Sequence, residues 1–298
     1  MKKEYLLAGV SILSWASTAA VGTLMMDSLS ALDMAFYNSL AATVFLLIVC
    51  AATGRLPLLC TLRPKTICLL SALGLLGMFF MSIFFYQGLA RLDAQQAYII
   101  NYLWPILIVF FSWLILKQPL TARTCLALLL SFFGVIIVAT EGSLTNLAGV
   151  DLIGVLSCVL GACCYALFSV LNMRVQCDKF VAMLVYYGAT TVVGLFCLLA
   201  VQGSVPMLTA TQWGGTLWLG MVTNGLAYTT WALAMDRGDT AKLSNLAYLT
   251  PFLSLVYIFF LLHEPIHLSS YIGLVFILSG VLLQAGTERS ANSRTAHT

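Results

Sequence analysis

The strongest constraint in this sequence is a succession of apolar runs, each about 20 residues long, separated by short polar segments. Runs of this length match a bilayer hydrocarbon core roughly 30 Å thick. They do not alternate between polar and apolar residues, as the strands of a membrane barrel would. Because only helices and closed barrels satisfy every backbone hydrogen bond in lipid, the runs predict an all-α membrane protein. The charged fraction of only 8% agrees with this class.

The runs predict ten transmembrane helices, and the positive charges support that count. Of the 14 Lys and Arg residues, only Arg91 falls on the side opposite the two termini. The positive-inside rule therefore places both termini in the cytoplasm. The predicted helices cover residues 5–25, 33–53, 66–90, 94–116, 122–140, 151–173, 179–201, 213–235, 240–262 and 269–286.

The two halves of the chain follow one plan. An offset of 146 residues carries Tyr102 onto Tyr248 and Pro105 onto Pro251. Five helices per copy is an odd number, so the second copy is predicted to lie inverted in the membrane, as in many secondary transporters. The predicted divisions are a first five-helix repeat over 1–142, a second, inverted repeat over 143–286, and a disordered cytoplasmic tail over 287–298.

The sequence offers little for catalysis or cofactor binding. No Asp, Glu, Lys, Arg or His lies deep in a predicted span, whereas proton-driven machines usually keep an ionisable group there. No hydrolase or phosphate-binding pattern occurs, so we predict that the protein is not an enzyme. The nine cysteines lack metal-ligand spacing, and the basic residues form no patch. We therefore expect no cofactor, no metal and no nucleic-acid partner.

The fourth and ninth predicted helices carry a proline near their centres. Pro105 removes a backbone donor and frees the carbonyl of Asn101, and Pro251 does the same in the second copy. A freed carbonyl must face protein or a water-filled cavity. Prolines can simply bend helices to fit a bundle, but matching interruptions in two repeats indicate a transporter site near the midplane.

Aromatic and small polar side chains recur on single faces of several helices and predict a neutral cavity. Rings with hydroxyl and amide tips suit an amphipathic ligand, because the rings stack while the tips form hydrogen bonds. The alternative is that many of these rings only pack helices together. The candidate substrate-binding residues are Trp15, Met78, Ser82, Phe85, Tyr98, Asn101, Tyr102, Trp104, Pro105, Tyr165, Asn224, Tyr228, Trp231, Tyr248 and Pro251.

This arrangement resembles the EamA branch of the drug/metabolite transporter superfamily over the whole chain except the tail. The segment Asn101-Tyr102-Leu103-Trp104-Pro105 is similar to the helix-four signature of aromatic amino acid exporters in that family. The resemblance implies a basket-like bundle in which helices one, three, four, six, eight and nine line a central cavity. Cys164 and Tyr165 depart from the Trp often found in helix six of relatives, which leaves the substrate open.

Together, the residues and the resemblance predict a secondary transporter that exports aromatic or other amphipathic amino acids across the bacterial inner (plasma) membrane by alternating access. Facilitated export is favoured over proton coupling, because the candidate carboxylates Asp33, Glu141 and Glu264 all lie near span ends. The alternatives are export of drugs or other small metabolites, and import of a nutrient. The expected partners are the small-molecule substrate and the lipid bilayer, with the protein a monomer or a weak homodimer.

Overall fold

The computed structural model of the chain describes residues 3–117, 121–143, 150–237, 243 and 246–295, with side chains placed up to Leu283. All regular structure in these residues is helical. The elements are α1 (Lys3–Ala16), α2 (Thr18–Met26), α3 (Ala31–Ala52), α4 (Leu56–Cys60), α5 (Pro64–Gly74), η1 (Leu75–Phe80), α6 (Met81–Leu89), α7 (Ala94–Asn101), α8 (Trp104–Leu116), α9 (Ala122–Ala139), α10 (Leu152–Asn172), α11 (Lys179–Gln202), α12 (Ala210–Leu217), η3 (Trp218–Leu226), α13 (Ala227–Arg237), α15 (Thr250–Leu262) and α16 (Leu268–Thr295).

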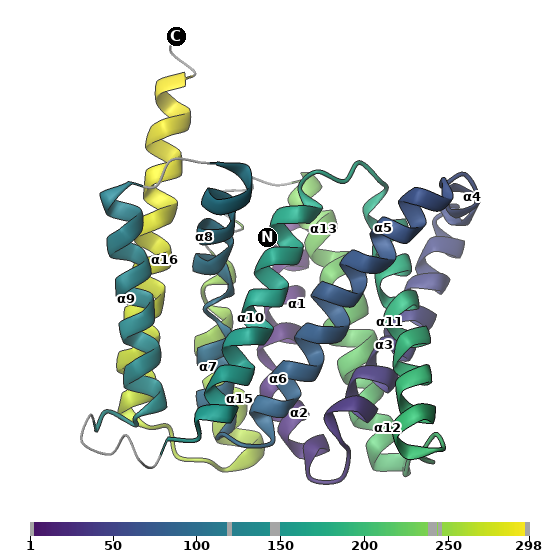
Figure 1. Cartoon of the computed structure of the whole chain (residues 1–298), viewed down its shortest axis with the longest axis horizontal. Helices are drawn as coiled ribbons and strands as arrows, with labels where there is room; N and C mark the ends of the chain where they lie inside the picture. Colours follow the sequence, from purple (N-terminus) through teal and green to yellow (C-terminus); the bar gives the residue numbers. More distant parts are fainter. Residues whose placement is uncertain (1–2, 118–120, 144–149, 238–242, 244–245, 296–298) are drawn as a thin grey trace.

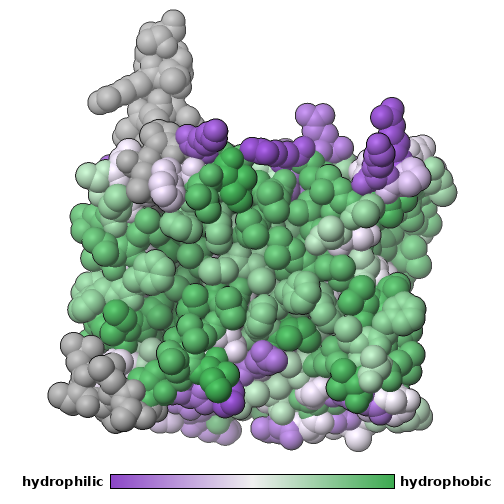
Figure 2. Space-filling model, in the orientation of Figure 1, coloured by the Kyte–Doolittle hydropathy of each residue, from purple (hydrophilic) through white to green (hydrophobic). Residues whose placement is uncertain are grey.

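Stacked end to end where they are interrupted, these elements form about ten helical passes that lie side by side (Figure 1). Seven are long and apolar enough to cross a membrane, and α15 and residues Leu268–Leu283 of α16 are shorter apolar helices. Figure 2 shows a broad apolar band between two polar rims, as a bilayer requires. The chain is therefore a multi-pass membrane protein, and the predicted all-α fold is confirmed.

The packing of the helices has approximate two-fold symmetry. The fifth pass, α9, packs along its counterpart α16, and α3 packs along its counterpart α11. The other large contacts occur in matched pairs: α10 on α6 corresponds to α1 on α13, and α11 on α5 corresponds to α3 on η3. Each repeat thus covers the face that the other leaves open, which is the arrangement predicted for two inverted five-helix copies.

The repeat also extends to irregular backbone. The third and eighth passes both contain a π-helical segment, η1 and η3. Helices α8 and α15 both begin with Pro in the first turn, and both end at a non-glycine residue in the left-handed conformation, Lys117 and His263, each with φ of 56°. These two residues are 146 positions apart, so the two copies end equivalent helices in the same way.

Three local details differ from a simple reading of the sequence. The first pass crosses as one span, Lys3–Met26, but its helix is interrupted at Ser17, whose hydroxyl donates to the carbonyl of Ser14 at 2.7 Å. Such side-chain bonds compete with the helical ladder. Asp93 precedes the fourth predicted helix and is a residue type that commonly caps helices, but at the N-cap of α7 its side chain makes no capping hydrogen bond; its carboxylate lies 3.7 Å from Nε2 of His267. Its counterpart at the 146-residue offset, Asp239, lies outside the described residues. Helix α16 continues past Gly286 to Thr295, because a formed helix propagates readily into polar sequence.

Glycines set the distance between α9 and α16. A Cβ on Gly134 would lie 2.6 Å from the carbonyl oxygen of Gly273, and a Cβ on Gly280 would lie 2.5 Å from that of Ala127. Between them, the Ser131 hydroxyl donates to the Ile277 carbonyl at 3.3 Å. Close backbone approach through small residues is the main source of helix association in membranes.

We predict that Gly134→Ala destabilises the protein by about 1–3 kcal/mol, because the added methyl group meets backbone that cannot move aside. Gly188→Ala in α11 is the matched control, since a Cβ there meets no atom within 4 Å. Thermal unfolding of the two purified variants in detergent would measure the difference. Equal melting temperatures would show that the α9–α16 crossing does not depend on Gly134.

Candidate functional site

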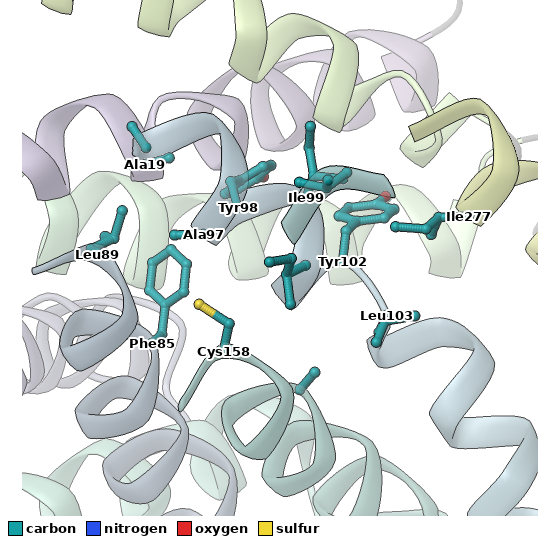
Figure 3. Packing of buried hydrophobic residues seen from close by; sticks show 14 of the residues in the cluster. Ala19, Phe85, Leu89, Ala97, Tyr98, Ile99, Tyr102, Leu103, Cys158 and Ile277 are labelled. Carbon is teal, nitrogen blue, oxygen red and sulfur yellow. The ribbon is translucent and has the colours of Figure 1, made fainter. Parts of the chain in front are cut away.

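A cavity of about 350 Å³ lies among the first, third, fourth, sixth, eighth and ninth passes. This volume falls within the usual range of small-molecule sites. Its wall consists of Trp15, Thr18, Met81, Ser82, Phe85, Tyr86, Tyr98, Asn101, Tyr102, Trp104, Tyr165, Asn224, Tyr228, Trp231, Ala247 and Thr250. Figure 3 shows Tyr98 and Tyr102 on the fourth pass, with Phe85 of α6 and Cys158 of α10 among the buried side chains nearby.

Most of the residues predicted from the sequence meet at this cavity. The predicted residues that line it are Trp15, Ser82, Phe85, Tyr98, Asn101, Tyr102, Trp104, Tyr165, Asn224, Tyr228 and Trp231. The four that do not line it are Met78, Pro105, Tyr248 and Pro251. Met78 packs in a second hydrophobic core, and Tyr248 packs against the main one. The two prolines stand in the first turns of α8 and α15, where they shape the helix starts.

Sequence reasoning left five lining residues out of the predicted set: Thr18, Met81, Tyr86, Ala247 and Thr250. A signal existed for each of them. Thr18, Met81 and Tyr86 lie on the polar or adaptable faces of the first and third passes. Ala247 and Thr250 are the counterparts, at the 146-residue offset, of Asn101 and Trp104. Applying the repeat in full to the fourth pass would have found both.

One side of the cavity is a cluster of rings from the first and eighth passes. The ring of Trp15 lies 5.2 Å from that of Tyr228 and 5.4 Å from that of Trp231, measured between centroids. The Ser11 hydroxyl lies one turn away, 2.8 Å from the Ala227 carbonyl oxygen and 2.7 Å from the Thr230 hydroxyl. These buried hydrogen bonds hold α1 against α13 and so fix the position of the rings.

Trp104 forms a second ring cluster on the fourth and sixth passes. Its ring centroid lies 5.8 Å from that of Tyr102 and 5.3 Å from that of Tyr165, both in edge-to-face geometry. Edge-to-face pairs are favourable because the positive ring edge meets the negative ring face. Trp104 is the first residue of α8, directly after the helix break, and the break therefore helps to place its indole in the cavity wall.

The break in the ninth pass is covered by a side chain from the fourth. Pro251 has no N–H, so the carbonyl of Ala247 has no intrahelical partner. The Tyr102 hydroxyl donates to that carbonyl at 3.0 Å. Nearby, the Tyr98 hydroxyl donates to the carbonyl of Trp15 at 3.2 Å, just before the break in the first pass. Tyrosines of the fourth pass therefore satisfy carbonyls at two of the interrupted helices.

Three polar atoms of lining residues are buried without a hydrogen-bond partner among the described residues: the Thr250 hydroxyl, which can donate or accept, and two atoms of fixed role, the Trp15 indole nitrogen Nε1 and the Asn101 side-chain oxygen Oδ1. The indole N–H can only donate, and Oδ1 can only accept. Buried polar groups are nearly always satisfied in proteins, so an unpaired group at a cavity calls for a partner. A bound ligand with one acceptor and one donor would satisfy both.

The described cavity wall contains no Asp, Glu, Lys, Arg or His. The charged side chains lie at the polar rims, where Arg55 pairs with Asp178 at 3.1 Å and Arg91 pairs with Asp151 at 3.1 Å. Each of these pairs connects the first repeat to the second. The Arg91 guanidinium also helps to lower the pKa of Asp151, although hydrogen bonding from the Gly154 backbone N–H is the larger cause. The described cavity wall therefore offers dipoles and aromatic rings, without formal charges.

Several known transporters are similar to this chain. The transporter YyaM of Bacillus subtilis is 28% identical over 224 residues, covering 73% of this chain and 72% of its own length. The aromatic amino acid exporter YddG of Ancylobacter novellus is 26% identical over 182 residues, covering 61% of this chain and 63% of its own length.

A solved crystal structure of a protein has the same fold, with a TM-score of 0.68, 21% sequence identity, and coverage of 97% of this chain and 98% of that one. The model of the EamA-like transporter family matches residues 2–140 and again residues 152–285. Together the two matches cover nearly all of the helical bundle. The chain therefore belongs to the EamA-like transporter family.

Proposed function

We propose that this transporter exports aromatic or other amphipathic amino acids across the bacterial inner membrane, by facilitated alternating access between its two repeats. The observation that carries the proposal is the neutral aromatic cavity, in which Trp15 offers an unpaired donor and Asn101 an unpaired acceptor. An amino acid has both groups that these atoms need, a carboxylate and an ammonium. Its side chain would stack on the surrounding rings.

The ring clusters favour an aromatic side chain over an aliphatic one. Trp15 and Trp104 both belong to the first repeat, and each contacts at least one ring of the second repeat among its two ring partners. The faces and edges of rings held in this way have fixed positions. A flat aromatic side chain packs against them more favourably than a branched aliphatic one. The similarity to an aromatic amino acid exporter supports the same substrate class.

The symmetry supports alternating access. The site lies between the repeats, and two of its interrupted helices, the fourth and the ninth, are equivalent passes of the two copies. In transporters built this way, the repeats exchange conformations and expose one site to each side in turn. Positively charged residues concentrate on the side of the termini, so that side is assigned to the cytoplasm and export is transport away from it.

We expect saturable counterflow of labelled phenylalanine and tryptophan in proteoliposomes, with an aliphatic amino acid carried poorly. Trp104→Ala should reduce aromatic flux at least tenfold, because it removes a ring from the cavity wall. Trp113→Ala is the matched control: this Trp lies on the same helix, is 39% exposed, and does not line the cavity. Absence of flux for every amino acid would refute this substrate class and direct the search to drugs and other metabolites.

The carboxyl group of Glu264 provides a test of facilitated transport. One of its oxygens, Oε2, is buried without a hydrogen-bond partner among the described residues. Burial is the main cause that raises the pKa of the Glu264 carboxyl group, and the nearby Asp93 raises it further, while His267 lowers it. An acid with a raised folded-state pKa stabilises the fold below its ordinary value of 4.5 and loses that contribution as pH rises through the folded pKa. Glu264→Gln should therefore be at least as stable as wild type at neutral pH.

We further expect Glu264→Gln to transport at the wild-type rate and to be indifferent to a pH gradient, because Glu264 lies outside the cavity. The measurement is the same counterflow assay with and without the gradient. Asp27→Asn, at an exposed position, serves as the control. Lost flux in Glu264→Gln with normal expression would instead show that this carboxyl carries protons during transport.

A further inference from the structure

Tyr86 lines the cavity, but its hydroxyl is hydrogen-bonded to a side chain from a helix that does not line the cavity. Its partner is Asn38 on α3, and α3 contributes no residue to the described cavity wall. The Asn38 Nδ2 donates to the Tyr86 hydroxyl oxygen at 2.7 Å. Both side chains are buried, with 3% of Asn38 and 5% of Tyr86 exposed. The pair therefore connects the second pass to the binding site.

The chemistry of this bond determines where the Tyr86 proton goes. An amide nitrogen only donates, so the Tyr86 oxygen is the acceptor and its own O–H is left over. Among the described residues, that O–H makes no hydrogen bond of its own, and the Asn38 Oδ1 also has no partner. The Asn38 Nδ2 occupies one side of the oxygen, and we infer that the proton points away from this amide, toward the cavity that Tyr86 lines. Tyr86 is thus prepared as a hydrogen-bond donor.

The fold itself does not require this hydroxyl. The third and eighth passes are equivalent: a Cβ on Gly74 would meet the backbone of α11, and a Cβ on Gly220 would meet the backbone of α3. At the offset of 146 that relates these glycines, the counterpart of Tyr86 is Ala232. The second repeat packs without a hydroxyl at this position. The helix packing that the two repeats share therefore does not explain the Tyr86 hydroxyl, which leaves a role at the cavity.

We propose that Tyr86 donates a hydrogen bond to the substrate carboxylate, and that Asn38 is a positioning residue that orients the Tyr86 proton. The inference deepens the proposed function and rests on it for the substrate class. Trp15 supplies a second donor to the cavity, and neither donor carries a charge. Two neutral donors suit the two oxygens of a carboxylate. The ligand class is therefore an amphipathic carboxylic acid, with the amino group recognised separately.

The test compares acids with matched molecules that lack the carboxylate. Binding of phenylalanine, phenylalaninamide and 3-phenylpropionate to the purified full chain is measured by ligand-induced thermal stabilisation, and phenylalanine transport by counterflow. Tyr86→Phe should weaken binding of the two acids about tenfold to a hundredfold, the usual loss for a hydrogen bond to a charged group. Binding of phenylalaninamide should weaken less, because its neutral carbonyl oxygen accepts a weaker hydrogen bond than a carboxylate does. The ratio of acid to amide affinity is insensitive to a general loss of folded protein.

Asn38→Leu tests the positioning role. The Tyr86 proton then rotates freely, so affinity for the acids should fall severalfold, and the substitution should add nothing in a Tyr86→Phe background. If Tyr86 instead donates to Asn38, Asn38→Leu releases the proton to the ligand, and acid affinity stays level or rises. That result overturns the positioning role. Tyr37→Phe is the control, because this neighbouring Tyr donates to the Pro206 carbonyl, away from the cavity.

The outcomes separate the two proposals. Loss of acid affinity in Tyr86→Phe with phenylalanine counterflow in wild type supports both. If phenylpropionate binds in a Tyr86-dependent way but no amino acid binds or is transported, the carboxylate site stands and the amino acid exporter does not. Wild-type affinity for the acids in Tyr86→Phe, or no binding of either acid to wild type, overturns the carboxylate site.

Discussion

The structure depends on the rule that every backbone polar group inside a bilayer must have a partner within the protein. Unbroken helices obey it by themselves, and most of the chain consists of them. The interrupted passes need partners from elsewhere, and tyrosines of the fourth pass supply them to the first and ninth. Tyr102 donates to the Ala247 carbonyl that Pro251 leaves free. The cavity exists where helices are broken, because carbonyls released there are tolerable only against protein, water or ligand.

Inverted symmetry explains how such a cavity can form between tightly packed helices. The α9–α16 and α3–α11 crossings relate equivalent helices, and glycines bring α9 and α16 into backbone contact. These crossings lie outside the ring-lined centre. The remaining passes therefore contact one another across the two-fold relation without closing fully, and their inner faces carry the polar and aromatic residues. The scaffold is symmetric, while residues such as Tyr86 make the site asymmetric.

Much of this architecture can be predicted from the sequence, because the bilayer imposes length, hydropathy and charge rules that single spans must satisfy. The helix breaks beside Pro105 and Pro251 follow from proline chemistry. The break at Ser17 does not, because a serine bends a helix only when its local partner is available. The Asn38–Tyr86 bond joins residues 48 positions apart on different passes, so no spacing rule reveals it. The sequence predicts where a residue lies along its own helix, but it does not predict which residue of another helix that residue contacts.

A neutral site has a consequence for transport itself. A counter-charge in the cavity would hold a charged ligand strongly and would remain unpaired and costly after release. Hydroxyl, indole and amide dipoles at Tyr86, Trp15 and Asn101 would compensate the two ends of the proposed zwitterionic substrate more weakly, and they cost less when the site is empty. The empty and loaded forms then differ less in energy than they would around a buried charge. A carrier that must reorient both loaded and empty works best with such a balance, which is the physical case for facilitated exchange in this fold.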